Sequence, residues 1–218
     1  MTGRRGLAYG VGGVLVTLLA AGLAEPAAAA GAITCPESAG RVSCGIGDSA
    51  TTTADNTSAV TGFSPDGAQV QLSVFPGVTL TTSGAGSFGI NAVNINGDSL
   101  GVGPVSVELS SSTITTSGVN AAGVRILSHG GDGSDGGSAH GGGGHDGNAG
   151  AKGGTAQLTA GSDPGFIIKT TGDESGGVSV ISQGGHGGNG SGGDTGGGGA
   201  GGIGGNGGAV IVQANGHV

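Results

Sequence analysis

Two glycine-rich tracts, near residues 130–154 and 184–208, contain most of the side chains that could carry chemistry in this sequence. Histidine and aspartate, two residue types that bind metal ions, recur there between glycines. The segment Gly130–Asp135, GGDGSD, matches the first six positions of a glycine- and aspartate-rich repeat that binds calcium. The large apolar residue that this repeat requires two positions later is replaced by Gly137, so the match fails where a core would form.

Asp132 and Asp135 are therefore the calcium candidates of the sequence, while solvated spacers in a flexible loop are the interpretation we favour for both tracts. His140, His145 and Asp146 also have ligand atoms, but the glycines around them provide no rigid frame that would fix a coordination geometry. We predict no resident metal and no cofactor.

The sequence contains no arrangement typical of a catalytic site. No Gly-x-Ser-x-Gly lies between a strand pattern and a helix pattern. The neighbouring carboxylates Asp173 and Glu174 fall in a turn-like stretch, where solvation is the ordinary explanation. Paired carboxylates of carbohydrate enzymes would also need aromatic platforms for sugar rings, and the chain has four Phe, one Tyr and no Trp. We predict that the protein is not an enzyme.

The two cysteines and the N-terminal segment both indicate export. Residues 1–30 begin with Arg4 and Arg5, continue with an apolar run and end in small residues, which is the pattern of a cleaved signal peptide. Cys35 and Cys44 follow directly, and in an oxidising compartment we predict a local disulfide between them. A metal pair or two free thiols are the alternatives.

Composition excludes several classes of protein. The chain has 218 residues, 57 of them glycine, and a formal net charge of −8, so it lacks the clustered basic residues of a nucleic-acid-binding surface. The glycines follow no strict triplet period throughout, which argues against collagen. Few large side chains are available, which favours a thin core of Val, Ile, Leu and Ala.

A fifteen-residue repeat organises the chain. It occurs three times without gaps, at Leu80–Asn94, Ile114–Ser128 and Ile168–Ser182. The second copy begins 34 positions after the first and the third begins 54 positions after the second, because a glycine-rich tract follows the second and third copies. Such a repeat is the usual signature of stacked, solenoid-like units whose insertions emerge on one side.

Each repeat unit predicts three short strands. In the first unit they lie near 79–82, 88–95 and 105–109, with apolar residues inward and Thr, Ser and Asn outward. Val70–Val74 predicts an earlier strand, and glycines at the corners are expected to supply positive φ. The predicted fold is all-β, a right-handed parallel β-helix of about three coils with glycine-rich loop insertions. Its predicted parts are a signal peptide at 1–30, an N-terminal cap region at 31–67 and the repeats at 68–218.

The signal peptide, the early cysteine pair and the line Ile114–Val124 with its glycine-rich insertions together resemble the passenger region of an autotransporter. This resemblance implies a secreted parallel β-helix displayed at the cell surface, with a structural or adhesive role and an unknown surface ligand or self-association as its partner. It also implies an outer-membrane β-barrel, which is absent from this chain; we therefore expect a fragment.

Two further interpretations remain open. The glycine tracts resemble those of the mycobacterial PE proteins with polymorphic glycine-rich repeats, although the helical N-terminal domain of that family is missing. An ice- or polysaccharide-binding solenoid is suggested by the threonines around Leu80 and Ile114, although Lys169 breaks that pattern in the third copy.

Overall fold

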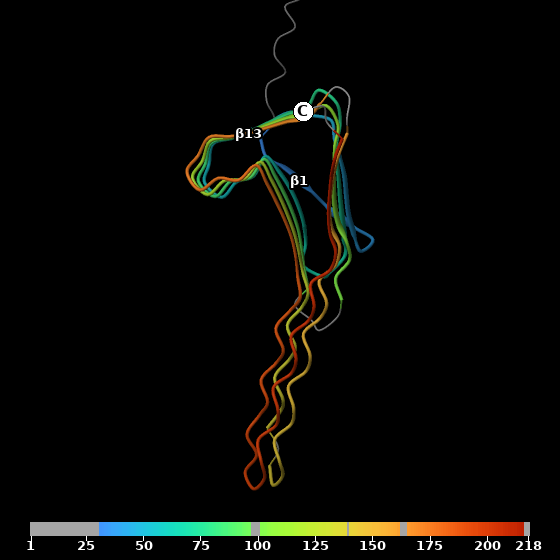
Figure 1. Ribbon diagram of the computed structural model, residues 1–218, viewed down its shortest axis with the longest axis vertical. Coiled ribbons are helices and arrows are strands. Elements are labelled where there is room, and N and C mark those ends of the chain that lie inside the picture. Colours follow the sequence, from blue (N-terminus) through green and yellow to red (C-terminus); the bar gives the residue numbers. More distant parts are fainter. Residues whose placement is uncertain (1–30, 97–100, 139, 162–164, 216–218) are drawn as a thin grey trace, which may run out of the picture.

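The computed structural model describes residues 31–96, 101–138, 140–161 and 165–215. The predicted signal peptide, 1–30, lies outside them. The described residues form fifteen strands and no helix (Figure 1). This confirms the all-β class, which follows from the abundance of Gly, Thr and Ser and from apolar residues that alternate with a period of two.

The strands belong to three sheets. The four-stranded sheet consists of β4 (Ala50–Thr52), β7 (Thr79–Thr82), β10 (Thr113–Thr116) and β13 (Ile167–Thr170). The five-stranded sheet consists of β1 (Ile33–Cys35), β5 (Val60–Ser64), β8 (Ile90–Ile95), β11 (Val124–His129) and β14 (Val178–Gln183). The six-stranded sheet consists of β2 (Glu37–Ser38), β3 (Arg41–Ile46), β6 (Gln69–Val74), β9 (Val105–Leu109), β12 (Ala156–Ala160) and β15 (Val210–Ala214).

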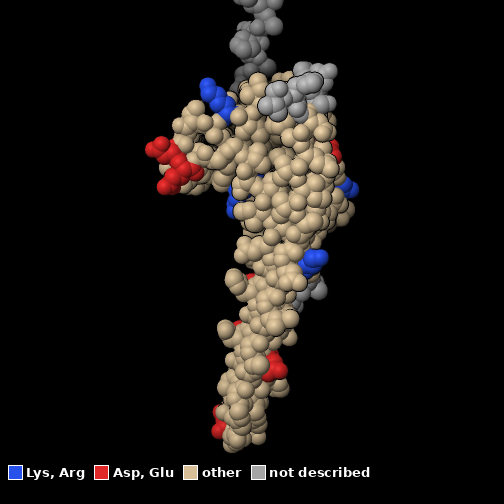
Figure 2. All heavy atoms as spheres, in the orientation of Figure 1, with Lys and Arg blue, Asp and Glu red and all other residues tan. Residues whose placement is uncertain are grey.

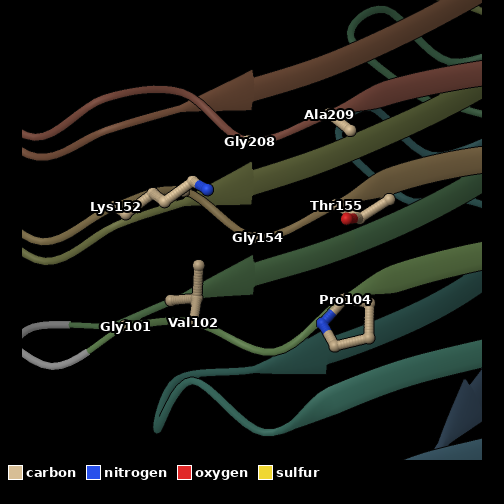
Figure 3. A pocket seen from close by; sticks show the side chains of 9 residues that line it. Gly101, Val102, Pro104, Lys152, Gly154, Thr155, Gly208 and Ala209 are labelled. Carbon is tan, nitrogen blue, oxygen red and sulfur yellow. The ribbon is translucent and has the colours of Figure 1, made fainter.

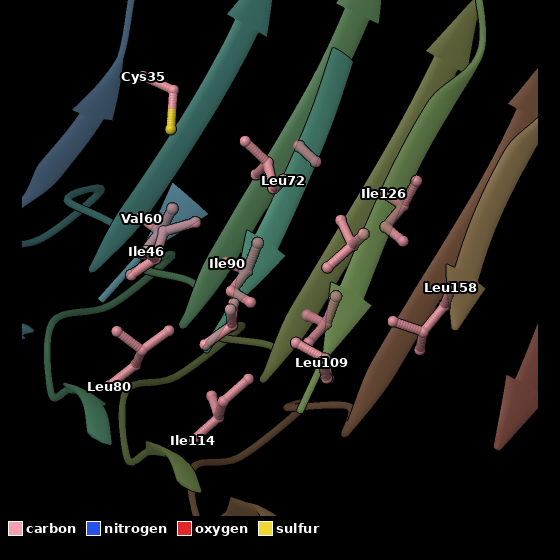
Figure 4. Packing of buried hydrophobic residues seen from close by; sticks show 14 of the residues in the cluster. Cys35, Ile46, Val60, Leu72, Leu80, Ile90, Leu109, Ile114, Ile126 and Leu158 are labelled. Carbon is pink, nitrogen blue, oxygen red and sulfur yellow. The ribbon is translucent and has the colours of Figure 1, made fainter. Parts of the chain in front are cut away.

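From β4 onward, successive strands join the four-, five- and six-stranded sheets in rotation, so each run of three strands forms one layer of the body. The repeat sets the register between layers, because Ile114 lies opposite both Leu80 and Ile168. The side chains of Leu80, Ile90 and Ile114 are fully buried between the sheets (Figure 4). Burial of each such side chain stabilises the fold by about 1.5–3 kcal/mol.

The last described layer, β13 to β15, is less covered than the others. Val178, Val210 and Val212, which we predicted to point inward, are 42, 51 and 55% exposed, while Ile168 and Val180 are partly buried against the core. The corresponding residues of the two preceding layers are buried, because those layers have neighbours on both sides.

The prediction of a right-handed parallel β-helix of about three coils is wrong. The structure has three sheets of four, five and six strands, and the largest is mixed because β2 runs antiparallel to β3. The repeat underestimated the number of layers, since Ala50 and Val60 occupy the places of Leu80 and Ile90 in an earlier layer. These smaller residues give too weak a pattern to align.

The N-terminal end of the stack is tied by a disulfide between Cys35 and Cys44, with the two Cα atoms 5.6 Å apart. Cys35 belongs to β1 in the five-stranded sheet and Cys44 to β3 in the six-stranded sheet, so the bond links two sheets. The chain reverses between them through the β2–β3 hairpin.

The glycines shared by the repeats permit close stacking of layers and do not have positive φ. The predicted positive φ occurs at two other corner glycines, Gly77 (83°) and Gly86 (64°). A Cβ on Gly118 would lie 1.9 Å from the carbonyl oxygen of Gly84, and one on Gly172 would lie 1.9 Å from that of Gly118. Asn120 (54°) and Glu174 (55°) occupy the position of Gly86 in the later repeats and also have positive φ.

Candidate functional site

The two glycine-rich tracts leave the body side by side and form one elongated arm (Figure 1). It contains four extended segments: segment 1 (residues 130–137), segment 2 (144–153), segment 3 (184–191) and segment 4 (197–208). The first tract supplies segments 1 and 2, and the second tract supplies segments 3 and 4. The arm is the largest feature that distinguishes this chain from a plain stack of strands, so we consider it as the candidate site.

Backbone hydrogen bonds at every third residue hold the four segments together. Segments 1 and 2 donate to segments 3 and 4 through the N–H groups of Gly133, Gly136, Gly144, Gly147, Gly150 and Gly153, at 2.7–3.0 Å, and Gly130 N donates at 2.9 Å to Gln183 O at the end of β14. Segment 3 donates to segment 2, for example from Gly188 N to Asn148 O at 2.9 Å. Segment 4 donates to segment 3, for example from Gly202 N to Gly188 O at 2.7 Å. A period of three residues is that of the polyproline II helix, whereas a strand has a period of two.

Glycine is required where the segments touch. A Cβ on Gly133 would lie 2.0 Å from Asn148 O, one on Gly147 would lie 2.2 Å from Gly188 O, and one on Gly188 would lie 2.1 Å from Ser134 O. No side chain could occupy these positions without moving the neighbouring backbone. The interpretation of the tracts as flexible spacers is therefore wrong: their glycine content permits a packed, hydrogen-bonded bundle.

The aspartates of the arm are hydrogen-bonded to its backbone. Asp132 Oδ1 accepts from His186 N at 2.7 Å, Asp135 Oδ1 from Asn189 N at 2.6 Å, and Asp146 Oδ1 from Ala200 N at 2.7 Å. The calcium candidates Asp132 and Asp135 thus each bridge segments 1 and 3. In the described part of the chain, no group of three or more His, Cys, Asp or Glu residues is placed to hold a metal ion.

His140 and His145 make different contacts in the arm. His140 Nδ1 lies 3.3 Å from Asp194 Oδ2 at the far end of the arm, where the His140 side chain is fully exposed. His145 contributes its backbone carbonyl, which accepts from Ser191 N at 3.0 Å. Most of the visible face of the arm carries neither Asp or Glu nor Lys or Arg side chains (Figure 2).

Buried and half-buried polar side chains fasten the arm to the body, and sequence analysis missed them. Asn94, Ser128 and Ser182 occupy the same register position in β8, β11 and β14. Ser128 Oγ accepts from Gly154 N at 3.0 Å, while Ser182 Oγ donates to Gly154 O at 2.6 Å and accepts from Gly208 N at 2.7 Å. The aligned repeats have a polar residue at this position in all three copies, and this pattern could have indicated a shared structural role.

A depression of about 420 Å³ lies beside the root of the arm, where the first repeat has no tract (Figure 3). Its lining includes Val102, Pro104 and Thr155, and Lys152 is its one ionisable side chain. Among the described residues that line it, no acidic side chain accompanies this lysine.

The outward threonines of the four-stranded sheet form a short array. Thr51, Thr81 and Thr115 lie opposite one another in β4, β7 and β10, and Lys169 takes the next position in β13. The threonine array therefore ends at Lys169 in β13, the residue at which the sequence pattern was also interrupted.

Comparisons with protein-family models, with curated proteins and with solved structures found no match for this chain. Within its described residues, no helix has the length and apolar character needed to cross a membrane.

Proposed function

We propose that this chain is an exported, surface-displayed structural protein of the autotransporter passenger type, in which the arm makes adhesive contacts. The observation that carries this proposal is the arm itself, four hydrogen-bonded segments that project from the body and expose mostly backbone and small side chains. A packed projection of this kind can present a contact surface at a fixed orientation to another molecule.

Two further observations support export and a role other than catalysis. A disulfide at Cys35–Cys44 is typical of an oxidising compartment. Three aspartates of the arm, Asp132, Asp135 and Asp146, accept hydrogen bonds from its backbone, and His140 is exposed at its end.

Export is tested by expressing the full chain in a Gram-negative host and determining the N-terminus of the product by mass spectrometry. We expect a product in the periplasm or medium that begins near Gly31. A full-length product retained in the cytoplasm, with Cys35 and Cys44 reduced, would contradict the proposal.

Adhesion is tested with an armless variant. The chain provides its own model for this variant, because β8 and β9 are connected without a tract. Residues 130–155 and 184–209 are each replaced by a copy of the connection at 96–104. We expect beads coated with the original protein to adhere to cells of the producing strain, and armless beads to adhere at least tenfold less. Equal adhesion of both would assign the contact to the body.

A further inference from the structure

The two outer sides of the arm differ in their free backbone groups. Segments 1 and 2 direct N–H groups at every third residue to segments 3 and 4. The corresponding N–H groups of segments 3 and 4, which lie 54 residues later, have no hydrogen-bond partner within the described residues. They belong to Gly184, Gly187, Gly190, Gly198, Gly201, Gly204 and Gly207. We call this side of the arm the donor face.

The donor face is also free of side chains at these positions. A Cβ on Gly201 or Gly204 would have its nearest neighbour at 3.7 or 3.5 Å, which is ordinary contact. Their counterparts Gly147 and Gly150 are covered, since a Cβ there would come within 2.2 and 2.3 Å of carbonyl oxygens in segment 3. The donor face therefore presents N–H groups and glycines at every third residue, as segments 1 and 2 do on the side that segments 3 and 4 cover.

The opposite side of the arm is closed to such an approach. Segment 3 approaches segment 1 through Gly188, whose counterpart in segment 1 is Ser134. Segment 4 approaches segment 2 through Gly202, whose counterpart in segment 2 is Asn148. Ser134 and Asn148 are hydrogen-bonded to each other through their side chains at 2.6 Å. These side chains occupy the space that a further glycine segment would need.

We propose that the donor face binds an extended segment of another polypeptide in which glycine recurs at every third residue. The contact between segments 1 and 3 is the template: the bound chain places glycine against the arm and accepts its N–H groups with every third carbonyl. In the polyproline II conformation both partners repeat every ~9 Å, so the bonds stay in register along the arm. Binding by addition to an unpaired backbone edge is an established mode for strands.

A second copy of this chain does not fit the donor face. Two donor faces would bring N–H groups against N–H groups, and the opposite side of a second copy carries Ser134 and Asn148. The ligand is thus a different glycine-rich chain with free carbonyl groups. This inference names the partner class of the adhesive arm and so rests on the proposed function.

The test uses the full chain and a fluorescent twelve-residue peptide of four Gly-Gly-Asn repeats, with binding followed by fluorescence anisotropy. A scrambled peptide of the same composition with adjacent asparagines is the matched control, since it places side chains against the arm. We expect the repeat peptide to bind at least tenfold more tightly than the scrambled one. Equal binding, or no binding of either peptide, would overturn the inference.

Two variants locate the binding surface. Gly201→Ala combined with Gly204→Ala leaves room within the arm but obstructs the donor face, so we expect at least a tenfold loss of affinity. Ile203→Ala is the control, because this side chain is 77% exposed and lies between the two donors in sequence. Binding unchanged in the double variant would contradict the assignment.

Amide hydrogen exchange provides a measurement that needs no variant. On peptide addition we expect exchange at Gly187, Gly201 and Gly204 to slow at least tenfold, while Gly202, already bonded to Gly188 O, changes little. If the peptide fails to protect these amides while the armless variant still loses adhesion, the inference is wrong and the proposed function stands. If the peptide protects none of these amides and the armless variant adheres as well as the original chain, both the inference and the proposed function are contradicted.

Discussion

Gly201 and Gly202 are neighbours in sequence but have different surroundings. A Cβ on Gly202 would lie 2.0 Å from Asn148 O, whereas the nearest atom to a Cβ on Gly201 would be 3.7 Å away. Gly202 packs against segment 2, and Gly201 belongs to the donor face. Packing within the arm therefore requires glycine at position 202 but leaves room for a methyl group at position 201.

We expect Gly202→Ala to destabilise the arm by about 1–3 kcal/mol, the usual cost of overpacking, because backbone must move to admit the methyl group. Gly201→Ala is the matched control and should change stability by about 0.5 kcal/mol or less. Amide exchange of segments 2 and 4 measures both effects. Similar exchange rates in the two variants would mean that segment 4 does not pack on segment 2.

The Asp146 carboxylate tests whether the arm's aspartates serve the backbone or a metal. Asp146→Ala leaves Ala200 N without its acceptor and should weaken the contact of segments 2 and 4 by about 1–2 kcal/mol. Asp146→Asn keeps a carbonyl oxygen and should retain most of that contact. Thermal unfolding with calcium or with chelator should give the same midpoint for the unsubstituted chain; a rise of several degrees with calcium would contradict this account.

At the scale of elements, the junction of arm and body depends on the strand ends. Ser182, at the end of β14, bonds to Gly154 and Gly208 and so joins both tracts to the five-stranded sheet. Asn94 performs a related role at the end of β8, where its amide donates to Ala68 O and Gly103 O at 2.6 and 3.0 Å. The same register position therefore organises the connection in layers with and without a tract.

Ser182→Ala should destabilise the root of the arm by about 1–3 kcal/mol, since Gly208 N and Gly154 O both lose a partner. Ser179→Ala, on the same strand at a position without such bonds, is the control and should be nearly neutral. Denaturant unfolding monitored through exchange of Gly154 and Gly208 gives both values. Equal effects would show that the hydroxyl of Ser182 does not fasten the arm.

The disulfide acts on the first strands of the body. By restricting a short loop in the unfolded chain, it should stabilise the fold by about 2–3 kcal/mol. We expect the double variant Cys35→Ser, Cys44→Ser to unfold at correspondingly lower denaturant concentration and to lose protection first in β1 and β3. An unchanged midpoint would mean that this end of the stack is held by packing alone.

For the molecule as a whole, the repeat predicted the register between layers but not their number. Leu80, Ile114 and Ile168 align because large aliphatic residues mark the buried positions. The earlier layer has Ala50 and Val60 at equivalent places, and its Thr-rich strands gave no comparable pattern. The antiparallel β2–β3 pair is only two residues long on the β2 side, too short to produce an alternation.

The arm could not be predicted from hydrophobic patterning, because it has almost no hydrophobic residues and its stability comes from backbone bonds. The available signal was the spacing of glycine by three, as in Gly130, Gly133 and Gly136, which high glycine content obscures. The roles of Asp132 and Asp135 were hidden for the same reason, since their partners are backbone N–H groups 54 residues away.

Amide hydrogen exchange of the tracts, residue by residue in the full chain, tests the central claim most directly. The account predicts slow exchange at Gly133, Gly147, Gly188 and Gly202, whose N–H groups are bonded between segments, and fast exchange at Gly187 and Gly201, whose N–H groups lie on the donor face. Uniformly fast exchange across 130–154 and 184–208 would contradict the existence of the arm.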